Sequence, residues 1–370
     1  MADDAMPRRQ CGTMPVHNRL ATTSPEYRAR RIAVEGFAKG FARALGMAPP
    51  MEDIIRIPVV VHVVHHTTHQ NVSAAQINSQ IAVLNRDFRR TNSDAAAVPA
   101  VFQPVAADAK IEFTLAVRDP NGGPTHGITR TQTSAREFHD DTDDIKFAAS
   151  GGHDAWPSDR YLNLWVAPKI MDPDIGELLG YAQFPGGSAN TDGVVLWYKC
   201  LGTEGTATRP YHLGRSATHE IGHWLNLLHV WGDDDGGCRR SDEVRDTPNQ
   251  SKSNMGVPTY PNITCRNGPH GDMFMNYMDY SDDACLCLFT AGQVARMRAA
   301  LLGPRASLLT SDGLTPPGAP AGFAPPLDPR LLPVLEEGEV PDDVFDGVGW
   351  APAGEMGAQM RGVFAGPGRA

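Results

Sequence analysis

Two histidines and a glutamate fall within five consecutive positions, His219-Glu220-Ile-Gly-His223. On an α-helix, residues four apart project from the same face, so the two imidazoles would converge. Zinc binds neutral histidine nitrogens, and two ligands one turn apart plus a third from elsewhere leave a fourth position for water. Glu220 can reach that water as a general base. The pattern therefore predicts a zinc site able to hydrolyse a peptide bond.

A third histidine, His229, follows shortly after the first two. Its distance along the chain suits a helix that ends and a backbone that then turns back. Matching all these positions by chance is expected in roughly 0.0006 chains of this composition. A buried helix with merely hydrogen-bonded histidines is the alternative, and it does not explain the spacing. We therefore predict that His219, His223 and His229 bind one zinc ion.

Composition limits the other functions that the chain could have. The 370 residues are 41% hydrophobic and 21% charged, which is ordinary for a globular protein with a sizeable core. A net charge of −10 argues against nucleic-acid binding, and no apolar run approaches the roughly 18 to 20 residues that span a bilayer. We expect protein or peptide substrates, no nucleic-acid or membrane partner, and a monomer.

The composition divides the chain into three segments. Residues 1–51 contain one helical stretch, 25–45, and no apolar core of a secretory signal. Residues 52–303 alternate strand-like and helix-like patterns and include the histidine motif, so they should form the catalytic core. Residues 304–370 are rich in Pro and Gly with few periodic apolar positions, which predicts a largely disordered tail.

Within the core, runs of β-branched and aromatic residues predict strands. These strands should cover residues 57–64, 111–117, 161–166, 180–184 and 193–198. Helices are expected from Ser73 to about Asn92, from about Ser216 onward, and over 291–302 after Thr290. Ser73 and Thr290 can cap the first and last of them.

The extended histidine motif resembles that of the metzincin metallopeptidases, HExxHxxGxxH followed by a methionine turn. Asn226 replaces the glycine, which there adopts a left-handed conformation that asparagine tolerates best among other residues. Met275-Asn-Tyr-Met278-Asp-Tyr280 resembles the methionine turn. The resemblance implies a structural role for Met278 beneath the metal, and a Tyr280 phenol that can donate to the oxyanion of the reaction.

Residues 57–302 further resemble one metzincin branch, the pappalysins. The likeness rests on Tyr161-Leu-Asn-Leu-Trp-Val, Gly180-Tyr-Ala-Gln-Phe-Pro-Gly-Gly, His229-Val-Trp-Gly-Asp233 and the run from Met275 to Cys285. It implies an α+β metzincin catalytic domain, with a twisted, mostly parallel sheet and helices in an upper subdomain over an irregular lower subdomain. Substrate would lie in the cleft between them, paired with an edge strand at 180–184.

The same resemblance implies a mechanism of latency. Arg9-Gln-Cys11-Gly-Thr13 is similar to pappalysin propeptides, in which the cysteine thiolate occupies the open position of the zinc. Activation would require removal of this segment by cleavage between Lys39 and Arg56. Asp283 matches an acidic residue of the family's specificity pocket, which would favour Arg or Lys directly after the scissile bond.

The resemblance also implies calcium and a disulfide. The run 241–248 resembles a calcium loop, with Asp242 and the carbonyls of Val244 and Thr247 as ligands. Cys238 and Cys265 match a family disulfide, which favours an oxidising compartment and a secreted protein.

A second family half-cystine is matched by Cys285, for which Cys200 or Cys287 would have to serve as the partner.

Two other functions remain possible on the sequence. Glu243 could be the third zinc ligand, as in thermolysin-like peptidases, although its surroundings predict a loop. A catalytically inactive zinc-binding module for adhesion or inhibition would be expected to lack the general base, yet Glu220 is present.

Overall fold

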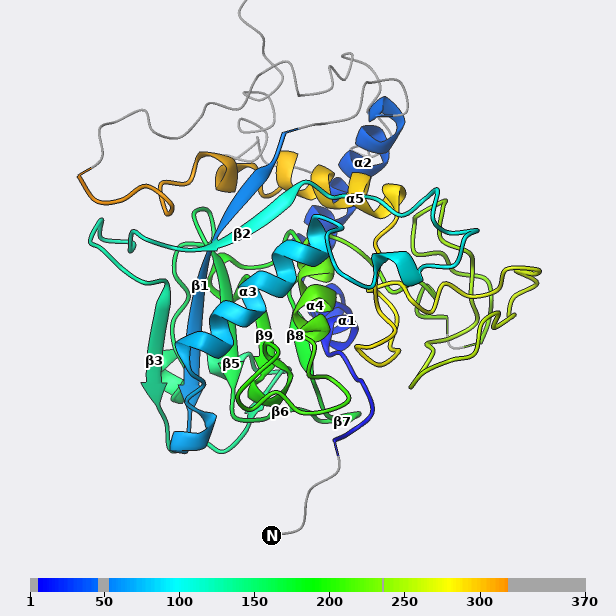
Figure 1. Cartoon of the computed structure of the whole chain (residues 1–370). Helices are drawn as coiled ribbons and strands as arrows, with labels where there is room; N and C mark the ends of the chain where they lie inside the picture. The colour runs from blue at the N-terminus through cyan, green and yellow to red at the C-terminus, as the bar shows by residue number, and fades with distance from the viewer. Residues whose placement is uncertain (1–5, 46–52, 235, 319–370) are drawn as a thin grey trace, which may run out of the picture.

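The computed structural model describes residues 6–45, 53–234 and 236–318. A twisted sheet with the strand order β2-β1-β5-β9-β8 crosses its centre, and β3 extends the sheet beside β1 (Figure 1). These strands are β1 (Ile55–His65), β2 (Ile111–Leu115), β3 (Ile128–Gln132), β5 (Leu162–Ala167), β8 (Gly180–Ala182) and β9 (Val194–Trp197). Every neighbouring pair is parallel except β8 and β9. Strand β1 is almost wholly buried, as its β-branched run predicts.

Helices α3 (Ala74–Phe88) and α4 (Arg215–Trp224) pack on the sheet and on each other. The Ser73 hydroxyl caps α3 by accepting from the Gln76 amide at 3.1 Å. Helix α5 (Ala291–Leu302) begins with a capping box in which Thr290 and Gln293 satisfy each other's backbone amides. The helix that bears the histidine motif is therefore fixed between the sheet and α3.

The chain between α4 and α5 forms the second subdomain, and its described residues contain no helix or strand. Side-chain hydrogen bonds replace regular structure here. The buried Asp279 carboxylate accepts from Gln250 and Asn254, each at 2.9 Å. A disulfide joins Cys238 to Cys265 across the same region, as the family resemblance implies. Such a segment keeps its shape through specific polar contacts.

A small sheet lies beside the main one. It has the order β4-β6-β7, formed by β4 (Phe138–His139), β6 (Ile170–Asp172) and β7 (Gly176–Glu177). Short 3-10 helices connect other elements: Thr68–Gln70, Ala95–Ala97, Asp144–Lys146, Ala148–Ser150, Ala189–Thr191, Tyr198–Cys200 and Ala306–Thr310.

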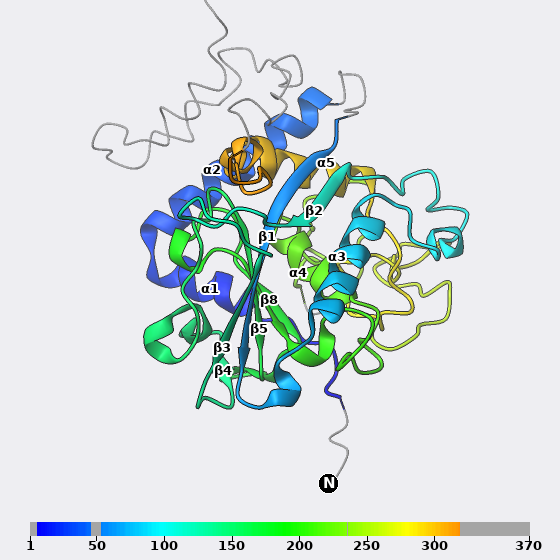
Figure 2. The same cartoon turned by 60° about the vertical axis from the view of Figure 1, so that its left-hand side comes forward.

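The N-terminal residues fold against the catalytic unit as two helices, α1 (Thr13–Thr23) and α2 (Pro25–Leu45) (Figure 2). Helix α2 packs along α5 through Ala38, Phe41, Ala299 and Leu302. Helix α1 lies beside β8. No helix in the described ranges is long and apolar enough to cross a bilayer.

The predicted α+β architecture is confirmed, with corrections in detail. Helix α2 has the bounds expected from the sequence, whereas α1 and β3 were not predicted. The tail was expected to begin at 304, but residues 304–318 are packed against the core: Arg305 is buried and the Gly313 carbonyl accepts from the Val117 amide. The rest of the predicted tail, 319–370, lies outside the described residues.

The sequence left the pairing of the remaining cysteines open, and the structure forms no second disulfide among the described residues. Cys285, Cys200 and Cys287 are all free thiols, and two of them are buried.

Candidate active site

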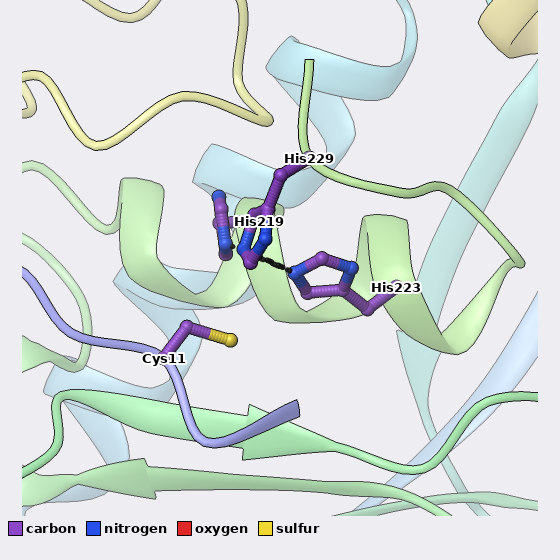
Figure 3. A group of neighbouring side chains, drawn as sticks. All are labelled: Cys11, His219, His223 and His229. Carbon is purple, nitrogen blue, oxygen red and sulfur yellow. Dashed lines mark hydrogen bonds between the residues drawn. The ribbon is translucent and has the colours of Figure 1, made fainter. Parts of the chain in front are cut away.

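Three imidazoles meet beside α4, two from His219 and His223 on the helix and one from His229 in the chain that follows it (Figure 3). The Nε2 atom of His223 lies 3.1 Å from Nε2 of His219 and 3.1 Å from Nε2 of His229. The Cys11 thiol approaches the same point, and one ligand atom from each of the four side chains lies within 4.8 Å of the others. The fold thus brings together the three histidines and the cysteine that the sequence singles out.

The two helical histidines are held by their outer nitrogens. Nδ1 of His219 donates to the Tyr277 carbonyl, and Nδ1 of His223 donates to the Leu227 carbonyl, both at 2.7 Å. A carbonyl can only accept, so these bonds place the proton on Nδ1 and leave the Nε2 lone pair facing the cluster. Burial, with repulsion from the neighbouring imidazoles, lowers the pKa of both rings well below the usual value. Both histidines are therefore neutral, as metal ligands must be.

The turn after α4 brings in the third imidazole. Asn226 has φ +76°, its amide donates to the His223 carbonyl at 2.8 Å, and the Leu227 amide donates to the Gly222 carbonyl at 2.9 Å. This is a Schellman ending with a left-handed asparagine. It confirms the conformation inferred for the residue that replaces glycine, and it redirects the chain so that His229 faces the helix.

His229 is oriented by a carboxylate and an indole. Its Nδ1 lies 2.6 Å from Oδ1 of Asp233, and its ring stacks on Trp231 with centroids 4.1 Å apart. A carboxylate behind a histidine raises the basicity of the nitrogen that faces a metal.

Met278 packs directly beneath the helix. Its side chain is fully buried, and a Cβ at Gly222 would lie 2.4 Å from the Met278 sulfur. A side chain at Gly222 would clash with the Met278 sulfur. Because position 222 is a glycine, Met278 can pack directly against α4.

The three nitrogens fit a tetrahedral zinc ion. Ligands at about 2.0 to 2.1 Å from such an ion lie roughly 3.3 Å apart, close to the spacing found here. A fourth direction points to the Cys11 sulfur. The donor set, three imidazoles and one thiol, is one that zinc favours.

Glu220 lies beside this cluster and is blocked. Its Oε2 accepts from the Cys11 thiol at 3.1 Å and from the Thr13 hydroxyl at 3.0 Å. Burial raises the pKa of the Glu220 carboxyl to about 7, although these two contacts act in the opposite direction. A carboxyl with such a pKa can take and return a proton near neutral pH. In this form the N-terminal segment occupies the space that a reacting water would need.

The N-terminal segment lies along the free edge of β8. Cys11 forms a parallel bridge with Gly180, and the Gly12 amide donates to the Gly180 carbonyl at 3.0 Å. Burial and the Glu220 carboxylate raise the pKa of the Cys11 thiol well above its usual value. A thiolate at this position therefore needs a cation beside it.

Tyr280 borders the cluster on another side. Its phenol oxygen accepts from the Cys11 amide at 3.2 Å, and its ring lies 5.0 Å from that of His229. Burial, followed by the charge of Cys11, raises the pKa of the phenol well above its usual value. The phenol thus keeps its proton and can act as a donor to an oxyanion.

Asp283 is fully buried and is covered by Arg9, and we call this place the Asp283 pocket. The two side chains form a buried ion pair, and Oδ2 of Asp283 also accepts from the amides of Leu213 and Arg215 at 2.8 and 3.3 Å. The guanidinium lies 4.9 Å from the ring centroid of Tyr211. Arg9 was not assigned a role from the sequence, although it belongs to the Arg-Gln-Cys-Gly-Thr run.

A second polar contact joins the N-terminal helices to the catalytic unit at Asn226. Its Oδ1 accepts from Arg31 at 2.7 Å, and its Nδ2 donates to Glu35 at 3.2 Å. Glu35 also accepts twice from Arg296 of α5, at 2.8 Å. The residue that forms the turn before His229 is thus also a docking point for α2.

The predicted calcium residues lie together. Oδ1 of Asp242 accepts from the Val244 amide at 3.1 Å, and Oδ2 accepts from the Thr247 hydroxyl at 2.7 Å. Glu243, the alternative zinc ligand, instead forms an ion pair with Lys39 at 3.0 Å and is partly exposed. This geometry does not support a thermolysin-like ligand set.

Several residues that shape the site were not found by sequence reasoning. Thr13, Asp233 and Gly222 all contact the cluster or its base. Thr13 and Asp233 lie inside sequence runs that resemble the family, so the resemblance could have pointed to them. The spacing of residues along the chain does not predict which side chains they contact.

Comparisons with known proteins agree with this geometry. A family model described as pregnancy-associated plasma protein-A matches residues 148–302. The chain is 32% identical to an extracellular metalloprotease of Pyricularia oryzae, over 72% of this chain and 81% of that protein. It is 31% identical to one of Verticillium alfalfae, over 80% and 91%.

Solved structures of a bacterial protease are also similar. Mature mirolysin of Tannerella forsythia in complex with a cleaved peptide is 52% identical, with a TM-score of 0.68, over 72% of this chain and 100% of that one. A promirolysin mutant of the same organism is 47% identical, with a TM-score of 0.73, over 81% and 97%.

The buried Arg9–Asp283 pair generates a prediction about the docked segment. Removing one partner of a buried ion pair leaves the other charge unpaired and costs about 3 to 5 kcal/mol. Arg9→Ala should therefore speed the digestion of residues 6–45 by added subtilisin at least about tenfold, measured in a Glu220→Ala background so that only the added protease cuts if Glu220 is the general base. Arg8→Ala removes the same charge from an exposed neighbour and should leave the rate unchanged. Equal rates for both variants would contradict this account.

Proposed function

The chain belongs to the pappalysin family of metzincin metalloproteases, and on that premise we propose that His219, His223 and His229 hold its zinc while Glu220 is the general base. The observation that carries the proposal is the convergence of three Nε2 atoms beside the Glu220 carboxylate. The family assignment supports an endopeptidase over an inactive zinc-binding module.

The residues of the chain divide the chemical work between them. When bound, zinc supplies a Lewis acid that polarises the scissile carbonyl and makes a nearby water more acidic. Glu220 takes a proton from that water as it attacks, and then returns the proton to the leaving amine. The Tyr280 phenol donates a hydrogen bond to the oxyanion that forms on the carbonyl. The outer hydrogen bonds of the imidazoles keep the three rings fixed throughout.

The N-terminal residues 1–51 act as a propeptide in this proposal. The Cys11 thiolate would take the fourth position of the metal, while Arg9 fills the Asp283 pocket and the segment occupies the edge of β8. The match to promirolysin covers 81% of this chain and the match to mature mirolysin 72%, which agrees with an N-terminal extension of this kind. The predicted cleavage interval includes residues 46–52, which lie outside the described residues.

We propose that Asp283 selects Arg or Lys directly after the scissile bond. The support is the Arg9 guanidinium, which already occupies this pocket in a buried ion pair. A substrate arginine at the same place would gain the same charge-assisted contact.

We also propose a calcium ion held by the Asp242 carboxylate and the carbonyls of Val244 and Thr247. The support is the Thr247 hydroxyl, which donates to both the Asp242 carboxylate and the Val244 carbonyl and so keeps these two oxygens close. An extracellular location is supported by the Cys238–Cys265 disulfide and by relatives named extracellular metalloproteases.

The general-base role predicts a separation of metal binding from turnover. Glu220→Ala should retain about one zinc per chain while peptide hydrolysis falls by several orders of magnitude, because the carboxylate moves a proton and does not bind the metal. Metal analysis and cleavage of an arginine-containing peptide measure the two properties. A variant with undiminished activity would disprove the mechanism.

Latency through the thiol predicts faster activation when Cys11 is changed. Cys11→Ala should shorten the lag before activity appears in purified full-length protein, since water can then reach the metal. Cys285→Ala removes another free thiol away from the cluster and serves as the control. An unchanged lag in the Cys11 variant would argue against the thiol block.

If Asp283 selects the residue after the scissile bond, removing its charge should lower activity mainly on peptides with Arg or Lys at that position. Asp283→Asn keeps the size of the side chain but removes its charge, so kcat/KM for peptides with Arg after the scissile bond should fall at least about tenfold. Asp282→Asn, at the partly exposed neighbouring position, should change it less than about twofold. Mass spectrometry of the products gives the position of the cut, and an unaltered preference in Asp283→Asn would rule out this pocket.

A further inference from the structure

Four acidic residues fall within residues 140–144, a segment that contacts the docked propeptide at Gly12 and Arg19. Two of its four carboxylates have partners, and Asp141 is exposed. Asp143 forms an ion pair with Lys146 at 2.8 Å and accepts from the Tyr181 hydroxyl at 3.1 Å. Asp144 accepts from the His139 amide at 2.9 Å.

Asp140 is the exception in this run. Its side chain is fully buried, and its carboxyl oxygens have no hydrogen-bond partner among the described residues other than the Asp172 carboxyl. Asp172, from the end of β6, uses Oδ1 to accept from the amides of Asp174 and Ile175. Burial, followed by the charge of Asp172 and the contact with it, raises the pKa of the Asp140 carboxyl to about 8. A buried acid that faces only a second acid is unusual and calls for a ligand or a function.

The path of the propeptide shows what Asp140 faces. Arg9 fills the Asp283 pocket, Cys11 reaches the histidines, and the next residue, Gly12, is hydrogen-bonded to the edge of β8. A Cβ placed on Gly12 would lie 2.7 Å from Oδ2 of Asp140 and 2.6 Å from the Leu178 side chain. These distances are shorter than real Cβ contacts, so Asp140 and Leu178 lie directly against the propeptide backbone at Gly12, and a larger residue there would require their side chains to shift. A substrate with Arg at Asp283 and its preceding residues beside Asp140 would run in the opposite direction to the propeptide, whose Cys11 bridges Gly180 in parallel.

The propeptide also brings a cation to the same place. Arg19 of α1 donates to the Asp140 carbonyl at 2.9 Å, and its charge acts on the Asp140 carboxyl. Arginines of the docked propeptide thus lie at both acidic positions along the cleft, Arg9 at Asp283 and Arg19 at Asp140. When the segment leaves, Asp140 loses the residues that cover it, together with this cation.

We propose that Asp140, backed by Asp172, forms an acidic subsite on the side of the scissile bond opposite the Asp283 pocket. The mature enzyme would then prefer peptides that carry Lys or Arg on both sides of the bond that is cut. This inference rests on the proposed function, because it assumes that the Asp283 pocket receives the residue directly after that bond. Asp140 is a specificity-determining residue here and takes no part in the chemistry.

The test uses enzyme activated from the full chain and a matched set of peptides. Each peptide has Arg after the scissile bond, and Lys replaces Ala at one of the three preceding positions in turn. At one position, Lys should raise kcat/KM at least about fivefold over Ala, and Asp140→Asn should abolish that gain while changing the all-Ala peptide less than about twofold. Asp140→Glu, which keeps the charge, should retain part of the gain.

Asp141→Asn is the matched control, because it removes the same charge from an exposed position in the same run. In Asp141→Asn, the increase in kcat/KM that Lys gives over Ala should stay within about twofold of the increase in the wild-type enzyme. Wild-type enzyme that cuts before Arg with no preference for Lys at any of the three positions would overturn the inference and leave the proposed function intact. Wild-type enzyme that cuts none of the peptides would instead count against the proposed function. Equal losses on Lys and Ala peptides in Asp140→Asn would mean a structural role, and would also overturn the inference.

Discussion

Gathering three imidazoles around one position in a buried site requires that each outer ring nitrogen meet a fixed partner. The Tyr277 carbonyl, the Leu227 carbonyl and the Asp233 carboxylate meet that requirement from three different parts of the chain. The methionine turn supplies the first acceptor, the helix ending supplies the second, and the loop after His229 supplies the third. The irregular subdomain, the left-handed turn and the sheet that supports α4 are thus all needed to keep the three Nε2 atoms facing one another.

The docked propeptide uses the contacts that a substrate would need. It pairs with the edge strand, places a guanidinium in the Asp283 pocket, and covers Glu220 with a thiol and a hydroxyl. Each contact alone is modest, but together they cover the Glu220 carboxyl. Burial then raises the pKa of the neighbouring acidic groups, so docking and protonation are coupled throughout this cleft.

The fold and the metal cluster could largely be predicted from sequence because their signals are local. The spacing of His219, Glu220 and His223 sets the helix face, and β-branched runs mark the buried strands. Helix α1 was missed because its run of Thr, Val and Asn has low helical propensity, so its stability comes from docking. The pairs Arg9–Asp283 and Arg19–Asp140 join residues more than a hundred positions apart, and no periodicity encodes such contacts. The core extends past 303 for the same reason, since the partners of Arg305 lie far away in sequence.

Asn226 has two structural roles, one in the turn before His229 and one in the docking of α2. Its backbone must turn in a way that few side chains permit, and its amide must both accept from Arg31 and donate to Glu35. Glycine would satisfy the first demand alone, and aspartate could not donate to a carboxylate. Natural selection on the inhibited precursor therefore acts on a residue that stays in the protease after maturation, so the two forms cannot evolve independently at this position.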